Sequence, residues 1–183
     1  MKTKLIFLTV FSILSLLVFV KCTEENNPVI EPIPDNNLIQ NPSFEENGTA
    51  TLSGWNTGPT ANINFTNDTP PNDGSWAITI DVVWGFFNDV YTTVKIPSGE
   101  HVFNLSFWSK FDSFPGYVEL FIITPDTSRL INTIQIDNNE WTNYSVSDTI
   151  VAGSNDSLKV LLSGGFSQLS PGKTYFDLCT LSY

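Results

Sequence analysis

From Ser75 to the C-terminus, apolar and polar residues alternate in short segments. These segments cover residues 75–83, 89–96, 101–111, 117–124, 129–136, 141–150, 157–164 and 173–183. Alternation with a period of two indicates half-buried strands, and the Pro, Gly, Asn, Asp and Ser residues between the segments are typical of turns. None of these segments has helical periodicity. The pattern predicts an all-β protein, built as a β-sandwich or jelly roll.

The alternation also assigns the side chains of three segments to opposite faces. The predicted core face carries Val90, Thr92, Val94, Ile96, Phe103, Leu105, Phe107, Val118, Leu120 and Ile122. The opposite face mixes aromatic and polar side chains: Tyr91, Thr93, Lys95, Asn104, Ser106, Trp108, Lys110, Tyr117, Glu119 and Phe121. Aromatic rings are unusual on a purely solvent-facing surface, so this face is a candidate binding surface. One β-bulge would exchange the two faces beyond it.

The first 21 residues have the features of a secretory signal peptide. Lys2 and Lys4 precede an apolar run over residues 5–20, which matches the charged and hydrophobic regions of such signals. The run is shorter than the roughly 20 residues that a membrane-spanning helix needs. An uncleaved N-terminal anchor helix is the alternative interpretation. In both cases the chain is held at a membrane.

Cys22 and the acidic pair Glu24 and Glu25 follow the apolar run. They resemble the lipidation site and the export signal of bacterial lipoproteins, although Lys21 stands where a small residue is usual. The resemblance implies a lipid on Cys22 and a surface-exposed position on the bacterial outer membrane. Residues 22–37 are rich in Pro and Asn, which favours an extended linker between the membrane and a folded domain.

Charge and cysteine content limit the functions that the chain after the signal peptide can have. From Cys22 onward there are five basic and nineteen acidic side chains, a formal charge of −14. Such a chain repels nucleic acid, so nucleic-acid binding is excluded. The stretch from Leu38 to Tyr183 is long enough for one domain. If Cys22 carries a lipid, Cys179 has no disulfide partner.

Residues 37–183 resemble carbohydrate-binding modules of families 4, 9, 16 and 22, which share a galactose-binding-like jelly roll. The resemblance lies in a series of ordered elements: "NLIQNPSFE" followed by "GW", then "NDGSWAITID", "VKIPSGEHVFNLSFWSK", "EWTNYSVS" and "YFDLCTL". It implies a jelly-roll β-sandwich over residues 38–183 that binds a carbohydrate polymer or glycan without catalysis. Cys179 departs from the closing pattern of these modules.

Sugar rings stack on aromatic faces, and their hydroxyls bind polar side chains. The predicted carbohydrate-binding residues are Trp84, Tyr91, Asn104, Trp108, Lys110, Tyr117 and Glu119. For Trp84 and Trp108, packing inside the fold is an open alternative. Trp55, Trp76 and Trp141 occupy positions where the resembled modules usually bury a ring, so we expect them in the core.

The resemblance also implies a structural Ca²⁺ ion that joins the first and last strands. The matching positions are Glu45, Asp73 in the loop 72–74, and Asp177. Carboxylate and backbone oxygens are the ligands that Ca²⁺ prefers. The alternative is that Glu45 and Asp177 are solvated turn carboxylates.

The sequence gives little basis for catalysis. His101 is the only histidine, and no nucleophile-elbow motif or cluster of zinc ligands accompanies it. Paired carboxylates for glycoside hydrolysis remain open by count alone, but we expect no enzymatic activity. The alternative function is a protein–protein adhesion or assembly module among outer-membrane proteins. Polar residues beside the rings favour sugar, because protein interface cores are drier and more apolar.

Overall fold

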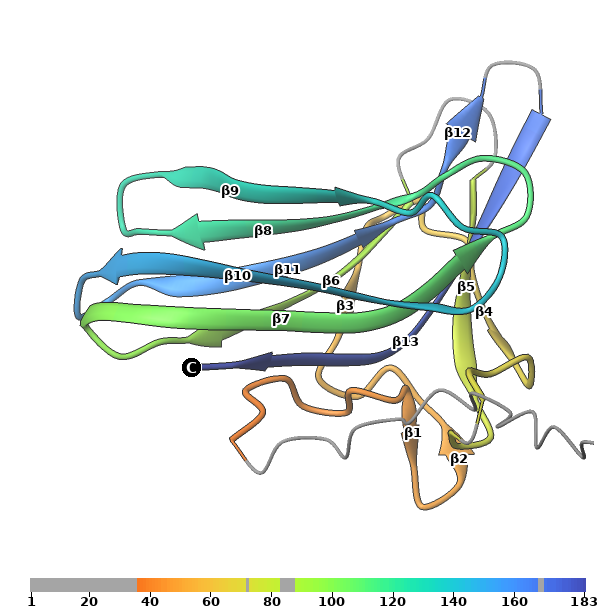
Figure 1. Ribbon diagram of the computed structural model, residues 1–183, viewed down its shortest axis with the longest axis horizontal. Coiled ribbons are helices and arrows are strands. Elements are labelled where there is room, and N and C mark those ends of the chain that lie inside the picture. Colours follow the sequence, from red (N-terminus) through yellow and green to blue (C-terminus); the bar gives the residue numbers. More distant parts are fainter. Residues whose placement is uncertain (1–35, 72, 83–87, 168–169) are drawn as a thin grey trace, which may run out of the picture.

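The computed structural model describes residues 36–71, 73–82, 88–167 and 170–183, except for the side chains of residues 166–171 (Figure 1). The predictions for the signal peptide, Cys22, most of the linker and Trp84 lie outside these residues. Every regular element in the described part is a strand. This part holds no helix of the length and apolarity needed to cross a membrane.

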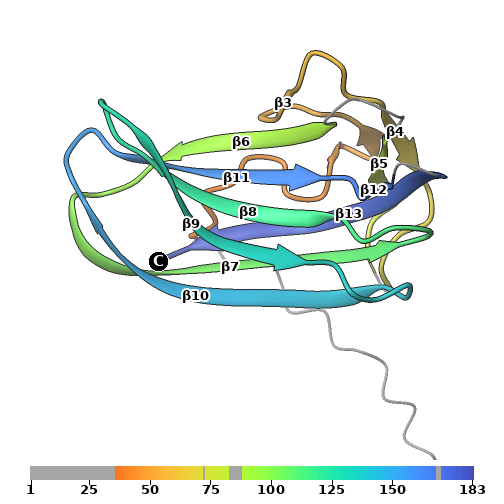
Figure 2. The same ribbon diagram turned by 90° about the horizontal axis from the view of Figure 1, so that it is seen from above.

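Two antiparallel sheets form a sandwich. One sheet has the order β10 (Thr142–Ala152), β7 (Gly99–Phe111), β13 (Ser170–Ser182), β5 (Ala77–Val82) and β4 (Ile63–Thr66), with β12 (Phe166–Ser167) paired to β13. The other has the order β3 (Asn56–Thr57), β6 (Asp89–Lys95), β11 (Ser157–Ser163), β8 (Tyr117–Ile123) and β9 (Ser128–Gln135). Figure 2 shows both layers from above. The all-β prediction is confirmed, and the strands from Ala77 onward follow the predicted segments closely.

The core lies between the two sheets and contains the side chains that the alternation assigned to it. Phe103, Leu105 and Phe107 on β7 are at most 1 % exposed, and the inward residues of β6 and β8 are buried or packed against the same cluster. Residues facing away from the core on these strands are mostly half-buried or exposed. The prediction of the faces is therefore confirmed for all three strands.

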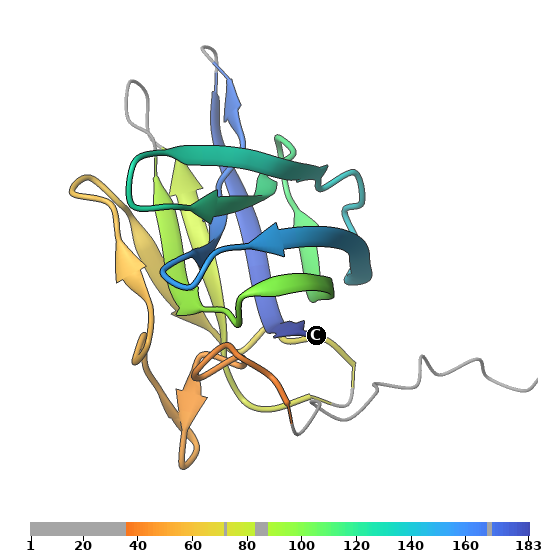
Figure 3. The same ribbon diagram turned by 90° about the vertical axis from the view of Figure 1, so that its left-hand side faces the viewer.

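The segment after Asn36 folds against the last strand. Leu38 donates a backbone hydrogen bond to Leu181 O at 2.7 Å, and Leu181 N donates to Asn37 Oδ1 at 2.9 Å. A small hairpin of β1 (Glu45–Glu46) and β2 (Thr49–Ala50) follows. Figures 1 and 3 place this hairpin on the side of β7 and β13 that faces away from β8 and β9.

The last strand changes register where it meets this N-terminal segment. Its pairing with β7 shifts between Asp177 and Thr180, and Leu178 adopts a φ of 48°. That conformation is unfavourable for a residue with a branched side chain. The irregularity turns Cys179 into the core as a fully buried free thiol, which donates at 4.0 Å to Asp177 O.

Only one of the three tryptophans predicted in the core lies there. Trp55 is 7 % exposed, packs against Phe44 with ring centroids 5.0 Å apart, and donates from Nε1 to Asn41 O. Trp76 and Trp141 are only half-buried and do not belong to the core cluster, so their assignment to the core is wrong. Both rings find polar partners at the surface instead: Trp76 Nε1 donates to Gly48 O, and Trp141 Nε1 donates to Asp68.

Candidate functional site

The predicted carbohydrate-binding residues are divided between two opposite faces of the sandwich. Asn104, Trp108 and Lys110 lie on the outer face of the six-stranded sheet. Tyr91, Tyr117 and Glu119 lie on the outer face of the five-stranded sheet. The expectation of a single surface is wrong, because alternation gives the two faces of a strand but does not give the sheet to which the strand belongs.

Trp108 does not offer its ring to a ligand, because it is only 7 % exposed although it points away from the core. The neighbouring outward residues Thr79 and Asp177 are also buried. The chain after β4 closes this area: Asp68 in that chain reaches Lys110 on β7, beyond β5 and β13 in the sheet order. The alternative that Trp108 serves packing is the correct one.

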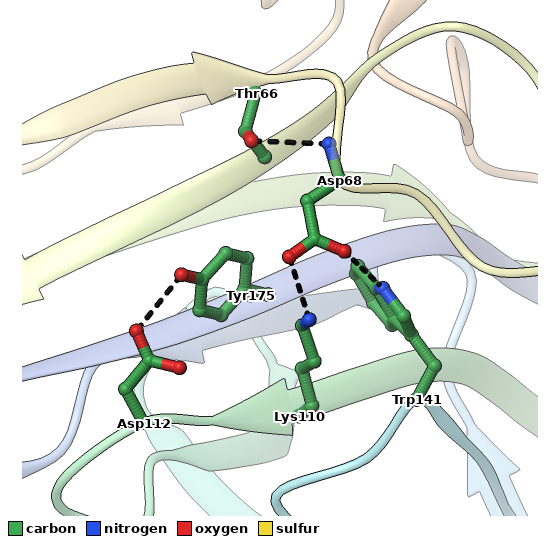
Figure 4. A network of polar contacts seen from close by, with 6 residues as sticks. All are labelled: Thr66, Asp68, Lys110, Asp112, Trp141 and Tyr175. Carbon is green, nitrogen blue, oxygen red and sulfur yellow. Dashed lines mark hydrogen bonds and ion pairs between the residues drawn. The ribbon is translucent and has the colours of Figure 1, made fainter.

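Lys110 belongs to a closed network of polar and aromatic side chains on this face (Figure 4), which we call the Lys110 cluster: Asp68, Lys110, Asp112, Trp141 and Tyr175. Lys110 Nζ lies 2.6 Å from Asp68 Oδ2, 5.3 Å from the Trp141 ring centroid and 4.7 Å from the Tyr175 ring centroid. Trp141 Nε1 donates to Asp68 Oδ1 at 3.0 Å, and the Tyr175 hydroxyl donates to Asp112 Oδ2 at 2.8 Å.

The electrostatics of the Lys110 cluster fit a structural role. Burial raises the pKa of Asp68, but hydrogen bonds from Lys110 and Trp141 and the charge of Lys110 outweigh it, so the pKa lies below its usual value. Burial and the hydrogen bond to Asp112 raise the pKa of the Tyr175 hydroxyl, which keeps its proton for that bond. Each polar tip in the cluster has a partner within the protein. We conclude that the cluster holds the chain after β4 against the sheet.

Asn104 lies on the same outer face but away from the Lys110 cluster. Its Oδ1 accepts a hydrogen bond at 2.6 Å from the Oγ of Ser147, its direct partner in the register of β7 and β10. Ser106 Oγ and the Asn143 side chain, which lie diagonally across the same two strands, are also hydrogen-bonded. The residues paired with Asn104 on the two neighbouring strands, Ser147 and Ser182, are polar and carry no ring. Asn104 therefore has no aromatic ring beside it in the sheet on which a sugar could stack.

The outer face of the five-stranded sheet combines rings and polar groups in rows that cross the strands. One row runs Asn56, Tyr91, Leu161, Glu119, Thr133; the next runs Thr93, Lys159, Phe121, Leu130; and Tyr117 lies between Ser163 and Gln135 in a third. Rows two residues apart along a strand are separated by about 7 Å. This spacing is comparable with the size of a sugar ring.

The aromatic and charged side chains of these rows remain accessible. Tyr117 is 39 % exposed, and Tyr91, Glu119, Phe121 and Lys159 are half-buried. Lys159 Nζ lies 4.8 Å from the centroid of Tyr91 and 5.3 Å from that of Phe121. Among the described residues, neither Lys159 nor Glu119 has an ion pair or a hydrogen bond through its side chain. We call Tyr91, Glu119, Phe121 and Lys159 the Lys159 cluster.

The Lys159 cluster can stack a sugar ring and bind its hydroxyls at the same time. Tyr91, Phe121 and the neighbouring Tyr117 offer ring faces, Glu119 accepts hydrogen bonds, and Lys159 donates them. Lys159 was missed by the sequence prediction. The alternation of residues 157–164 contains the signal, since it places Lys159 on the face opposite Val160, but only the pairing of β11 between β6 and β8 brings it to the rings.

The three predicted calcium ligands lie near one another, around the point where the pairing of β13 with β7 shifts register. Glu45 Oε2 accepts a hydrogen bond from Ser75 N at 2.9 Å, and a side chain at Gly74 would collide with the Glu45 carboxylate. Oδ2 of Asp73 and Oδ2 of Asp177 are each buried without a hydrogen-bond partner in the described part. Burial first, and then the carboxyl of Asp73, raise the pKa of Asp177 to about 10.

This arrangement fits a cation, because a positive ion would satisfy both unpartnered oxygens and relieve the repulsion between the carboxylates. The side chains do not suffice alone: among the described residues, no group of three or more His, Cys, Asp and Glu side chains is arranged to hold a metal ion. A calcium site here would also need backbone carbonyl oxygens, which are common calcium ligands.

Comparison with solved structures shows which class of protein has this fold. A family 16 carbohydrate-binding module aligns with a TM-score of 0.61 and 20% identity, over 80% of this chain and 100% of the module. A family 61 module solved with β-1,4-galactotriose gives 0.55 and 18%, over 79% and 97%. The xylan-binding family 22 module of Paenibacillus barcinonensis Xyn10C gives 0.54 and 14%, over 76% and 90%. The chain therefore has the jelly-roll β-sandwich fold of carbohydrate-binding modules.

Longer proteins contain the same fold as one part. The chain covers 21% of the enzymatically active domain of tailspike protein 4 from bacteriophage CBA120, with a TM-score of 0.63 and 17% identity. It likewise covers 27% of an α-L-arabinofuranosidase structure solved with arabinose. No protein-family model and no curated protein sequence matches the chain.

Proposed function

We propose that the protein binds a carbohydrate polymer or glycan, without catalysis, through the outer face of the five-stranded sheet. The observation that carries this proposal is the Lys159 cluster with Tyr117 beside it, where accessible rings alternate with unpaired polar groups. Sugars need both kinds of contact in one place. The fold shared with carbohydrate-binding modules of families 16, 22 and 61 supports the same function.

The place of action belongs to the same proposal. The charged start, apolar run and Cys22 support a lipid anchor at the outer membrane, with the domain exposed on the bacterial surface. The described chain begins next to the C-terminus, where Asn36 Nδ2 donates to Tyr183 O at 3.0 Å, and it continues against β13. The proposed anchor would therefore be attached on the side of the six-stranded sheet. This supports a glycan-binding role for the opposite face.

A calcium ion is the proposed structural cofactor. Glu45, Asp73 and Asp177, together with backbone carbonyl oxygens, would hold it between the N-terminal segment and β13. When bound, the ion supplies positive charge that compensates the negative charge on the buried carboxyl oxygens of Asp73 and Asp177. This role concerns stability, because these residues lie outside the sheet that carries the proposed binding face.

The test is binding of the protein to an array of polysaccharides and glycans, with and without a calcium chelator. We expect a hit that Tyr91→Ala and Tyr117→Ala each weaken by at least tenfold, as expected for lost stacking contacts of about 1.5 kcal/mol. Tyr183→Ala is the matched control, because Tyr183 is also exposed but lies at the end of the other sheet.

Three other outcomes would each change the account. A hit that survives both tyrosine changes would move the site to another surface. A well-folded protein with no hit would favour an adhesion or assembly module. Unchanged folding and binding in the chelator would remove calcium from the proposal.

A further inference from the structure

Lys159 differs from the other cations of the domain in how its charge is compensated. The chain from Leu38 onward has five basic side chains: Lys95, Lys110, Arg129, Lys159 and Lys173. Lys110 and Lys173 each have a carboxylate oxygen within 4.0 Å, from Asp68 and Asp81. The side chains of Lys95 and Arg129 are exposed, so water solvates their charges. Lys159 is half-buried and has no carboxylate partner among the described residues.

The position of Lys159 makes this difference significant. It lies on β11, the central strand of the five-stranded sheet, and its ammonium group is held between the rings of Tyr91 and Phe121. Two ring faces stabilise a cation only partly, by about 0.5–1 kcal/mol each at an exposed site. They also fix its place, so that a ligand lying on the rings must lie against the ammonium group.

Glu119 is an acidic residue on the adjacent strand β8, on the same outer face as Lys159. In the register of β8 and β11, Glu119 lies opposite Leu161 whereas Phe121 lies opposite Lys159, so the two charges belong to successive rows. The distance between their charged atoms exceeds that of an ion pair. Glu119 can therefore accept sugar hydroxyls in its own row and leaves Lys159 available for a different group.

We propose that the carbohydrate bound by this face is acidic, with a carboxylate or sulfate group that pairs with Lys159 Nζ. The inference rests on the proposed function and names the substrate class of the same site. An anionic group between the two rings would supply the counter-charge that Lys159 lacks, and a charge-assisted hydrogen bond is stronger than one to a neutral hydroxyl. The net negative charge of the domain does not prevent this, because distant charges are screened beyond about 8 Å at physiological salt.

The experiment compares acidic polymers with the same polymers after their charge is removed. The intact protein, purified in detergent, is titrated with polygalacturonate, alginate and glucuronoxylan, each beside its carboxyl-reduced form. Carrageenan, compared with its desulfated form, tests whether a sulfate group supplies the negative charge. We expect at least one acidic polymer to bind at least tenfold more tightly than its neutral counterpart, which corresponds to a charge-assisted contact of at least about 1.4 kcal/mol.

Three variants assign the effect to Lys159. Both Lys159→Met and Lys159→Arg keep an apolar stem between the rings, but only arginine keeps the positive charge. Lys159→Met should therefore abolish the preference for the acidic form, and Lys159→Arg should retain most of it. Lys173→Met changes the net charge by the same amount on the other sheet and should leave the preference unchanged.

The outcomes separate this inference from the proposed function. Equal or tighter binding of the neutral forms, unaffected by Lys159→Met, would overturn the inference and leave carbohydrate binding intact. A preference that Lys173→Met abolishes as well would overturn it too, since net charge would then explain the result. Binding of neither acidic nor neutral polymers would contradict both proposals. A preference in the sulfate pair alone would support the inference with a sulfate ester as the charged group.

Discussion

The two outer faces of the sandwich each carry a lysine between two aromatic rings. On the six-stranded sheet, Lys110 lies between Trp141 and Tyr175. On the five-stranded sheet, Lys159 lies between Tyr91 and Phe121 at similar distances. The two lysines differ in how their charge is compensated, because Asp68 pairs with Lys110 at 2.6 Å and no carboxylate of the described chain pairs with Lys159.

This difference shows why residue composition does not identify a binding site by itself. Lysine and aromatic rings occur together on both faces. The chain after β4 supplies Asp68 to Lys110, and the resulting network gives the polar groups of the Lys110 cluster partners within the protein. On the other face the same combination is left for a ligand. We therefore expect changes in the Lys110 cluster to alter folding and changes in the Lys159 cluster to alter binding.

The largest expected effect is on stability, from removing a ring of the Lys110 cluster. Trp141→Ala deletes a half-buried ring that contacts Lys110 and Tyr175 and leaves Asp68 without its indole donor. We expect a loss of about 2 kcal/mol in the free energy of unfolding, below the range for fully buried rings. Tyr117→Ala on the open face should cost less than about 0.5 kcal/mol. Urea titration measures both free energies of unfolding, and equal losses would contradict the structural role of the Lys110 cluster.

A smaller effect is expected from exchanging each lysine for methionine. Lys110→Met removes the ion pair, in which the lysine side chain is 15% exposed, and should cost about 1 kcal/mol of unfolding free energy. Lys159→Met should change stability by less than about 0.5 kcal/mol, because Lys159 has no ion pair to lose and contacts of the Met sulfur with the same two rings offset the lost cation–π contacts. The pair of thermal unfolding curves is the measurement. A larger loss for Lys159→Met would mean that the open cluster is also structural.

The smallest expected effect is a dependence of stability on pH. The pKa of Asp68 lies below its ordinary value of 3.8, so its ionised form stabilises the fold above that pH. The contribution is lost as the pH falls through the lower folded-state pKa. The stability difference between the wild type and Asp68→Asn should thus be constant near neutral pH and shrink below about pH 4. Because the Asp68 side chain is 47% exposed, the difference should stay below about 1 kcal/mol.

The control for this series is Asp126→Asn, in the exposed turn between β8 and β9. Its difference from the wild type should show no comparable change over the same pH range. A difference for Asp68→Asn that grows as the pH falls would contradict the sign of the effect.

Much of the sandwich could be predicted from the sequence, because alternation reports burial directly. The inward residues of β6, β7 and β8 were identified correctly from their period of two. The tryptophans were harder, since a large ring can be buried by the core or by a surface loop. Trp108 and Trp141 both lie on the outer side of the six-stranded sheet, and Trp141 has its partner Asp68 in the chain after β4. Such contacts between distant segments leave no local pattern.

The candidate site shows the same limit. Tyr91, Tyr117 and Glu119 were found from their strands alone, and the structure brings them to one face. Lys110 has the same local features and belongs to the other sheet. The missing information is the order of the strands, which depends on long-range pairing and decides which residues become neighbours.

The most direct test of the account is to map where a bound glycan contacts the protein. Backbone amide chemical shifts of the isotope-labelled protein would be followed during titration with a polysaccharide that it binds. We predict that the largest changes occur on β6, β8 and β11, around Tyr91, Glu119 and Lys159, with little change around Lys110 and Tyr175. Changes centred on β7 and β13 would contradict the assignment of the open face as the binding site.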